Sequence, residues 1–121
     1  MIDLVQFAGE ARKAVRINGH DFRYHLLDVA EELETGKLTE PYMDTVVLDK
    51  CIKTAVFALS VDSIDGKPFF DPVMEATPSS KAEARFQRAA KLQYWWIETW
   101  FKAYAEERGE YEKGLEEAKK K

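Results

Sequence analysis

The stretch Val15–Leu26, VRINGHDFRYHL, decides how this chain folds. Apolar and polar residues alternate on both sides of the central Asn18-Gly19 pair, and this period of two is typical of strands with one buried face. Asn-Gly is a preferred pair for a type I′ turn, because both central residues need a positive φ. We therefore predict a β-hairpin over residues 14–26. A lone hairpin is only marginally stable in water, so its apolar face must pack on another element or on a partner.

A short helix is expected directly after the hairpin. Asp28 is a favourable N-cap residue, and Thr35-Gly36 provides a suitable end. We predict that the apolar side chains of this helix face the core and that its carboxylates face solvent. The apolar set is Val29, Ala30 and Leu33, and the acidic set is Glu31, Glu32 and Glu34.

A second, longer helix is predicted over residues 42–60, because Thr39 is a good N-cap and Pro41 is tolerated in a first turn. Cys51 lies within its apolar pattern, which favours a buried thiol over a reactive one. The apolar residues recur every three or four positions and cover more than half of the circumference, so we expect this helix to be central. They are Met43, Val46, Val47, Leu48, Ile52, Ala55, Val56, Ala58 and Leu59.

Residues 61–78 interrupt the regular pattern with Gly66 and with three of the four prolines of the chain. The segment is nevertheless too apolar for a free linker. We predict an ordered loop that turns at Asp65-Gly66 and is held in place by Phe69 and Phe70.

A long helix is predicted over residues 80–108, because Ser80 and Glu83 match a capping box and no glycine follows until Gly109. At 1.5 Å per residue this helix would be about 40 Å long, more than the roughly 35 Å diameter of a globule of this size. Residues 109–121 would form a charged tail. The chain is thus predicted to be a single α+β domain over residues 1–121, mainly α, with an N-terminal β-hairpin packed on a helical bundle and a long C-terminal helix.

The long helix carries the candidate binding residues. Consecutive Tyr94, Trp95 and Trp96 point about 100° apart, so one helix face cannot hold all three rings. We predict that most of the aromatic set packs in the core and that one ring, Trp95 or Tyr94, anchors another protein chain, since large aromatic side chains concentrate binding energy. The candidate protein-binding residues are Tyr94, Trp95, Trp96, Trp100, Phe101 and Tyr104.

Composition argues against several other classes of protein. The 121 residues carry 18 basic and 22 acidic side chains, a net charge of −4, whereas nucleic-acid binding normally requires a basic surface. No apolar run approaches the roughly 20 residues of a transmembrane helix, and the N-terminal sequence has no basic region typical of a signal peptide. We therefore expect an intracellular protein that binds neither nucleic acid nor membrane.

No sequence pattern typical of catalysis is present. There is no glycine-rich phosphate loop, no nucleophile elbow and no supported Ser/His/Asp set. His20 and His25 are five residues apart, which places them on opposite faces of a strand where they do not share a metal ion. Asp62 and Asp65 do not have the spacing of a calcium loop. We expect no catalytic residue, no metal site and no cofactor.

Three parts of the sequence together resemble the tail assembly chaperones of long-tailed bacteriophages and related small tail or baseplate assembly proteins. The resemblance covers about residues 14–108 and depends on pattern rather than on a single motif. Its parts are the hairpin Val15–Tyr24 with Leu27-Asp28 and Glu31-Glu32 after it, the apolar helix that ends in Leu59–Lys67, and the aromatic helix with Trp96, Trp100 and Tyr104 before a charged tail.

The resemblance implies a non-enzymatic protein that binds tape-measure, tube or baseplate subunits of a phage tail. Such a protein would act in the host cell cytoplasm during assembly, as a transient chaperone or as a resident part of the virion tail or baseplate. Self-association into a homo-oligomer is also open. A small regulatory adaptor that binds a host or phage protein is the alternative function.

Overall fold

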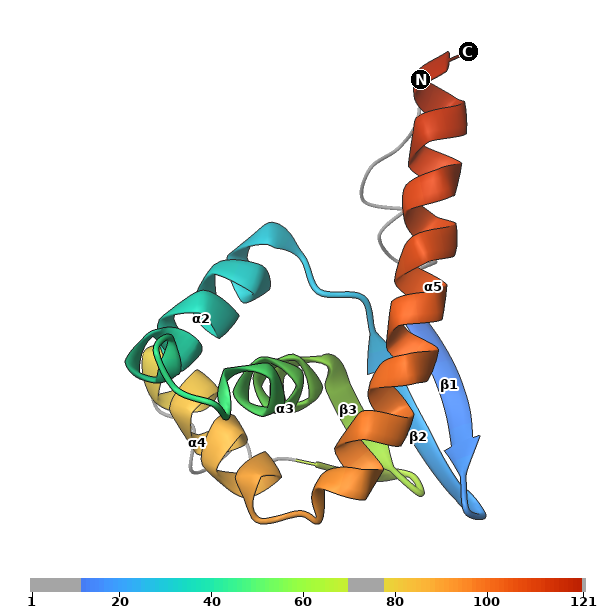
Figure 1. Ribbon diagram of the computed structural model, residues 1–121. Helices are drawn as coiled ribbons and strands as arrows, with labels where there is room; N and C mark the ends of the chain where they lie inside the picture. The colour runs from blue at the N-terminus through green and yellow to red at the C-terminus, as the bar shows by residue number, and fades with distance from the viewer. Residues whose placement is uncertain (1–11, 70–77, 121) are drawn as a thin grey trace.

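The computed structural model describes residues 12–69 and 78–120. One face of a small antiparallel sheet is covered by the helices α3 and α5, and α2 and α4 pack on α3 (Figure 1). The strands lie in the order β1 (Arg12–Ile17), β2 (His20–His25), β3 (Val61–Ile64) and β4 (Lys67–Pro68). The helices are α2 (Val29–Thr39), the short 3₁₀ helix η1 (Glu40–Tyr42), α3 (Leu48–Ser60), α4 (Pro78–Ala90) and α5 (Tyr94–Lys120). The predicted class, α+β and mainly α, is confirmed.

The N-terminal hairpin forms where the sequence predicts it. Ile17 lies opposite His20, so Asn18 and Gly19 alone make the turn between β1 and β2. Their φ values are 51° and 84°, and a type I′ turn requires positive φ at both positions. The strongly local signal of this Asn-Gly pair therefore sets the register of the first two strands.

The predicted loop over residues 61–78 is wrong in its first part, which adds two strands to the sheet. Val61–Ile64 pairs with β2 and then turns back into β4. Asp65 and Gly66 make this turn, as predicted, with φ values of 54° and 79°. Phe69 is buried against α3, whereas Phe70 lies outside the described residues. Val61 and Ile64 are three residues apart, so the segment lacks the period-2 alternation by which a strand is distinguished from a loop.

Two helices, α4 and α5, replace the single helix predicted over residues 80–108. α4 already begins at Pro78, so the Ser80–Glu83 pattern does not mark its start, and residues 91–93 separate α4 from α5. No glycine or proline marks the break. It allows α4 to pack on α3 while α5 crosses the sheet, so tertiary packing overrides a continuous helical pattern. α5 continues to Lys120, which makes most of the expected tail over 109–121 helical.

The central helix is α3, but it is shorter than predicted. It begins at Leu48, and every residue from Thr54 to Ser60 is buried. Residues 43–47 are not helical, so Met43 and Val46 do not share the buried face and are exposed instead. Ile52 and the half-buried Cys51 also lie nearer the surface than expected, and burial raises the pKa of the Cys51 thiol.

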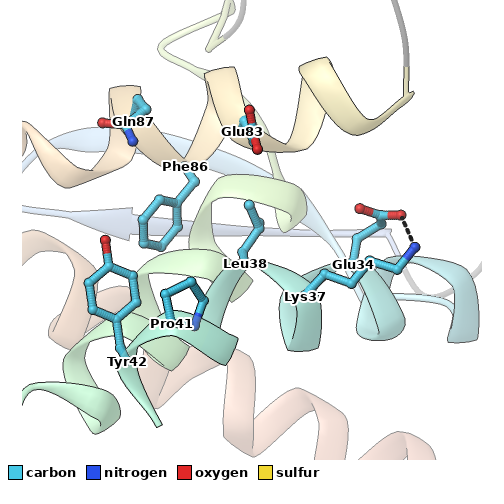
Figure 2. Close-up of a pocket in the computed structure, with 8 residues that line it drawn as sticks. All are labelled: Glu34, Lys37, Leu38, Pro41, Tyr42, Glu83, Phe86 and Gln87. Atoms are coloured by element: carbon cyan, nitrogen blue, oxygen red, sulfur yellow. Dashed lines mark hydrogen bonds and ion pairs between the residues drawn. The ribbon is translucent and has the colours of Figure 1, made fainter. Parts of the chain in front are cut away.

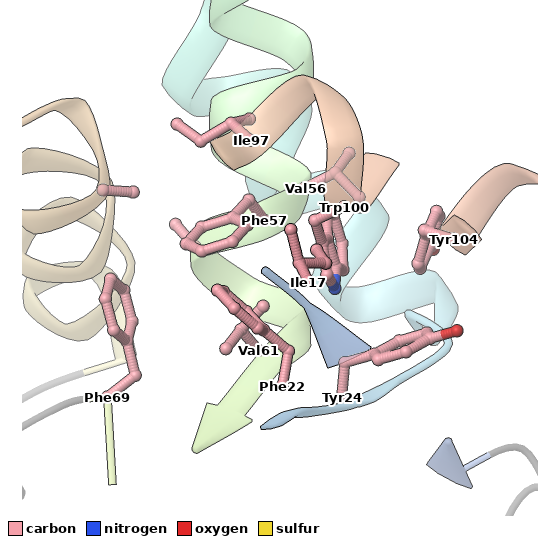
Figure 3. Packing of buried hydrophobic residues seen from close by; sticks show 12 residues of the cluster. Ile17, Phe22, Tyr24, Val56, Phe57, Val61, Phe69, Ile97, Trp100 and Tyr104 are labelled. Carbon is pink, nitrogen blue, oxygen red and sulfur yellow. The ribbon is translucent and has the colours of Figure 1, made fainter. Parts of the chain in front are cut away.

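The core lies between the sheet, α3 and the first turns of α5 (Figure 3). The ring of Trp100 is fully buried and meets Tyr24 and Phe57 edge-on, with ring centroids 5.5 Å and 5.2 Å apart. Tyr104 stacks on Trp100 at 5.1 Å, and its hydroxyl accepts a hydrogen bond of 3.3 Å from the Leu27 N–H. These contacts join residues that are far apart in the sequence, and they fix α5 on the sheet.

α2 has the opposite orientation from the one predicted. Val29 and Leu33 are 74% and 64% exposed. Glu31 instead lies 2.8 Å from His25 Nε2, and Glu32 lies 3.0 Å from a guanidinium nitrogen of Arg108. The prediction is wrong because these cations, on β2 and α5, attract the carboxylates toward the body of the protein. Asp28 caps the helix as expected and forms a capping box with Glu31.

In the described part of the chain, no helix has the length and apolar character required to cross a bilayer.

Candidate protein-binding surface

Trp95 is the aromatic side chain that the described structure exposes most, with 53% of its surface accessible. It occupies the second position of α5. Ile97 and Trp100 follow two and five positions later and are buried in the core, so Trp95 lies on the other side of the helix. The rotation of α5 therefore leaves this ring in solvent.

A shallow, mainly apolar hollow of about 180 Å³ is lined by Trp96, the neighbour of Trp95, and not by Trp95 itself. Trp96 forms the link between them, because its ring meets Trp95 edge-on at 5.0 Å and also lines the hollow. The residues that line the hollow come from β2, β3, α5 and the turn before α5. They are His20, Phe22, Ile64, Leu92 and Trp96.

Trp96 is held by the sheet beneath it. Its ring stacks on Phe22 at 6.1 Å and meets His20 edge-on at 5.6 Å. His20 Nδ1 in turn lies 2.6 Å from Asp65, whose pKa is lowered by the Asp21 N–H and by His20. The wall between Trp95 and the hollow is therefore fixed by contacts from both hairpins. We call Trp95 and the hollow together the Trp95 surface.

The starts of α3 and α5 lie side by side. Lys50 Nζ lies 5.1 Å from the centre of the Tyr94 ring, and Lys53 Nζ lies 5.6 Å from that of Phe101. The exposed Val46 and Val47 directly precede α3 at this junction. Lysine side chains thus lie over two of the half-buried rings of α5.

The six predicted binding residues have different environments. Trp95 is exposed, and Trp96, Tyr94 and Phe101 are half-buried. Trp100 and Tyr104 are buried in the core and cannot contact a partner, so the prediction is wrong for these two rings. Their burial agrees with the prediction that most of the aromatic set packs in the core and that one ring is left outside it.

Several apolar residues that the sequence pattern assigns to the core are exposed. One signal in the sequence bears on the orientation of α2. Asp28 and Glu31 have the spacing of a capping box, which places the Glu31 side chain at the start of the helix. Nothing comparable marks the residues before α3. The exposed apolar residues concerned are Val29, Leu33, Met43, Val46, Val47 and Ile52.

Both histidines contact carboxylates. His25 donates from Nδ1 to Asp62 at 3.1 Å and from Nε2 to Glu31 at 2.8 Å. Burial lowers the pKa of His25, but these hydrogen bonds and the two negative charges outweigh it and raise the pKa to about 9. The carboxylates lie at opposite ring nitrogens, so they do not converge on one ion. Within residues 12–69 and 78–120, no group of three or more ligands is arranged to hold a metal.

Comparison with known proteins gives no significant match to a family model, to a curated protein or to a solved structure.

Proposed function

We propose that this protein is a non-enzymatic binding protein that docks another protein chain on the Trp95 surface. The observation that supports this most directly is a half-exposed tryptophan in edge-on contact with Trp96, a ring that lines an apolar hollow. Tryptophan is enriched among the residues that contribute most to protein–protein binding. The hollow offers a place where an apolar side chain of the partner is removed from water, so both features favour the same type of contact.

We propose further that the bound chain is a phage tail protein, such as a tape-measure, tube or baseplate subunit. The support is the resemblance of residues 14–108 to tail assembly chaperones and baseplate assembly proteins. The site of action would then be the host cell cytoplasm, with a resident place in the virion tail or baseplate as the second option. The non-enzymatic role, the partner and the location together form one testable proposal.

The variant Trp95→Ala tests the surface. We expect it to reduce binding of the tail protein at least tenfold, because a hot-spot tryptophan contributes about 2 kcal/mol or more. The measurement is the amount of tape-measure, tube and baseplate protein that co-purifies with a tagged copy from phage-producing cells. Thermal unfolding of the variant should remain close to that of the unaltered protein, since Trp95 lies outside the core.

Leu33→Ala is the matched control, since it removes an exposed apolar side chain from α2. It should leave the co-purified amount unchanged. Equal capture of tail proteins by the Trp95→Ala variant would show that this surface is not used. Stoichiometric capture of a host protein in place of any tail protein would instead favour the regulatory adaptor.

A further inference from the structure

We propose that a groove between α2 and α4 binds an arginine or lysine side chain from a segment of a partner protein. The groove has a volume of about 420 Å³ and lies where α2 and η1 face α4 (Figure 2). It shares no residue with the Trp95 surface. This second site therefore goes beyond the proposed function, and the two proposals can be tested independently.

The floor of the groove is apolar. Phe86 extends from α4 toward Leu38 and Pro41, and the Tyr42 ring lies 6.4 Å from the Phe86 ring (Figure 2). This floor suits the aliphatic stem of a long basic side chain, because such side chains bury their methylene groups on apolar surface while the charged end stays at the rim. The face of an aromatic ring also attracts a cation.

The charged side chains at the rim of the groove favour a basic occupant. Lys37 Nζ already has a partner, since it lies 3.4 Å from Glu34 Oε1. Glu83 is exposed on α4 and makes no ion pair with any other residue of the described chain. The three charged rim groups therefore sum to −1, and the carboxylate that remains available is Glu83. A basic side chain would neutralise it, whereas an acidic one would be repelled.

The size of the groove indicates a peptide segment rather than a single side chain. About 420 Å³ accommodates a basic side chain and an apolar neighbour on the same floor. The expected occupant is thus a stretch of a partner protein in which arginine or lysine lies next to leucine or a similar residue.

Two capped peptides test this proposal on the full chain. One is acetyl-Leu-Arg-Leu-amide, and the other has citrulline, a neutral isostere, in place of arginine. We expect the arginine peptide to shift the backbone amide NMR signals of Leu38, Glu83 and Gln87 and to bind about three- to fivefold more tightly than the citrulline peptide. Raising the salt concentration to about 1 M should remove most of this difference.

Glu83→Gln should reduce the affinity for the arginine peptide to that for the citrulline peptide. The side chain is exposed, so the variant is expected to fold normally. Glu110→Gln, an exposed position on α5, is the matched control and should have no effect. Equal affinity for the two peptides, an unchanged affinity after Glu83→Gln, or signal shifts confined to other residues would each overturn the proposal. None of these outcomes would alter the Trp95→Ala result.

Discussion

His25 joins three elements through one charged ring. It lies on β2, and it donates to Glu31 of α2 and Asp62 of β3. With a pKa of about 9, the imidazole is protonated at neutral pH and both of its nitrogens act as donors. The positive charge of this single residue thus holds the N-terminal turn of α2 against the sheet.

Stability should depend on pH through His25. Because its pKa is raised from 6.5 to about 9 in the folded state, its contribution is complete below pH 6.5 and is lost as the pH rises through 9. We predict a fall of about 2 kcal/mol in the free energy of unfolding across this range, since both carboxylates are partly exposed. Urea unfolding at several pH values, followed by tryptophan fluorescence, measures it. His25→Gln should remove this pH dependence, and an unchanged slope in that variant would contradict the assignment.

Truncation should destabilise the protein far more at Trp100 than at Trp95. Trp100→Ala removes a fully buried ring and leaves a cavity between Tyr24 and Phe57, so we predict a loss of about 3–5 kcal/mol in the free energy of unfolding. Trp95→Ala should cost less than about 1 kcal/mol. Chemical denaturation followed by circular dichroism compares them. Similar losses would mean that the two rings do not differ in burial.

A related substitution refines this prediction for Trp100. In the described part of the chain, its indole Nε1 has no hydrogen-bond partner. Trp100→Phe keeps an aromatic ring in the core and removes this unpaired donor, so it should cost less than Trp100→Ala.

At the scale of elements, one substitution should have opposite effects in a turn and in a helix. A Cβ added at Gly19 or at Gly36 would meet no atom within 4 Å, so neither position is limited by space. Gly19 has a φ of +84°, and we predict that Gly19→Ala lowers the free energy of unfolding by about 1 kcal/mol. Gly36 lies within α2, where alanine is favoured by about 1 kcal/mol. Thermal unfolding of the two variants should shift in opposite directions, and an unchanged or raised unfolding temperature for Gly19→Ala would refute the type I′ turn.

The sequence predicts correctly those elements whose conformation depends on one or two neighbouring residues. Asn18-Gly19 and Asp65-Gly66 form turns, and Asp28 caps α2, because each depends on the backbone preferences of one or two residues. The break at residues 91–93 and the rotation of α2 depend instead on distant contacts, such as the ion pair between Glu32 and Arg108. The periodicity of apolar residues along the chain does not predict such contacts.

The candidate site could likewise be predicted only in the part that depends on local helix geometry. That one ring would be left outside the core follows from the 100° step between Tyr94, Trp95 and Trp96. The hollow beside Trp95 was not predictable, because its lining combines β2, β3 and the start of α5. The burial of Trp100 and Tyr104 agrees with the predicted core packing of most of the aromatic set, because the two residues are four positions apart on one helix face.

For the whole molecule, we predict a monomer at micromolar concentration in the absence of its partner. The exposed apolar residues of the described chain are distributed over α2, the segment before α3, and α5. A stable dimer usually buries about 800 Å² on each copy, which the Trp95 surface alone does not provide. Light scattering over a concentration series should give a mass near 14.0 kDa. A defined oligomer would show that these residues join in one self-association surface.

α5 is 27 residues long, and its C-terminal end extends past the other described helices and strands (Figure 1). Its outermost ion pairs to the described body join Arg108 to Glu32 and Glu107 to Lys13. The 25 helical steps from Trp95 to Lys120 span about 38 Å at 1.5 Å each. A continuous helix has a fixed length, so molecules held at its two ends would keep a constant separation. In an ordered array of subunits, the length of α5 would therefore determine the repeat distance.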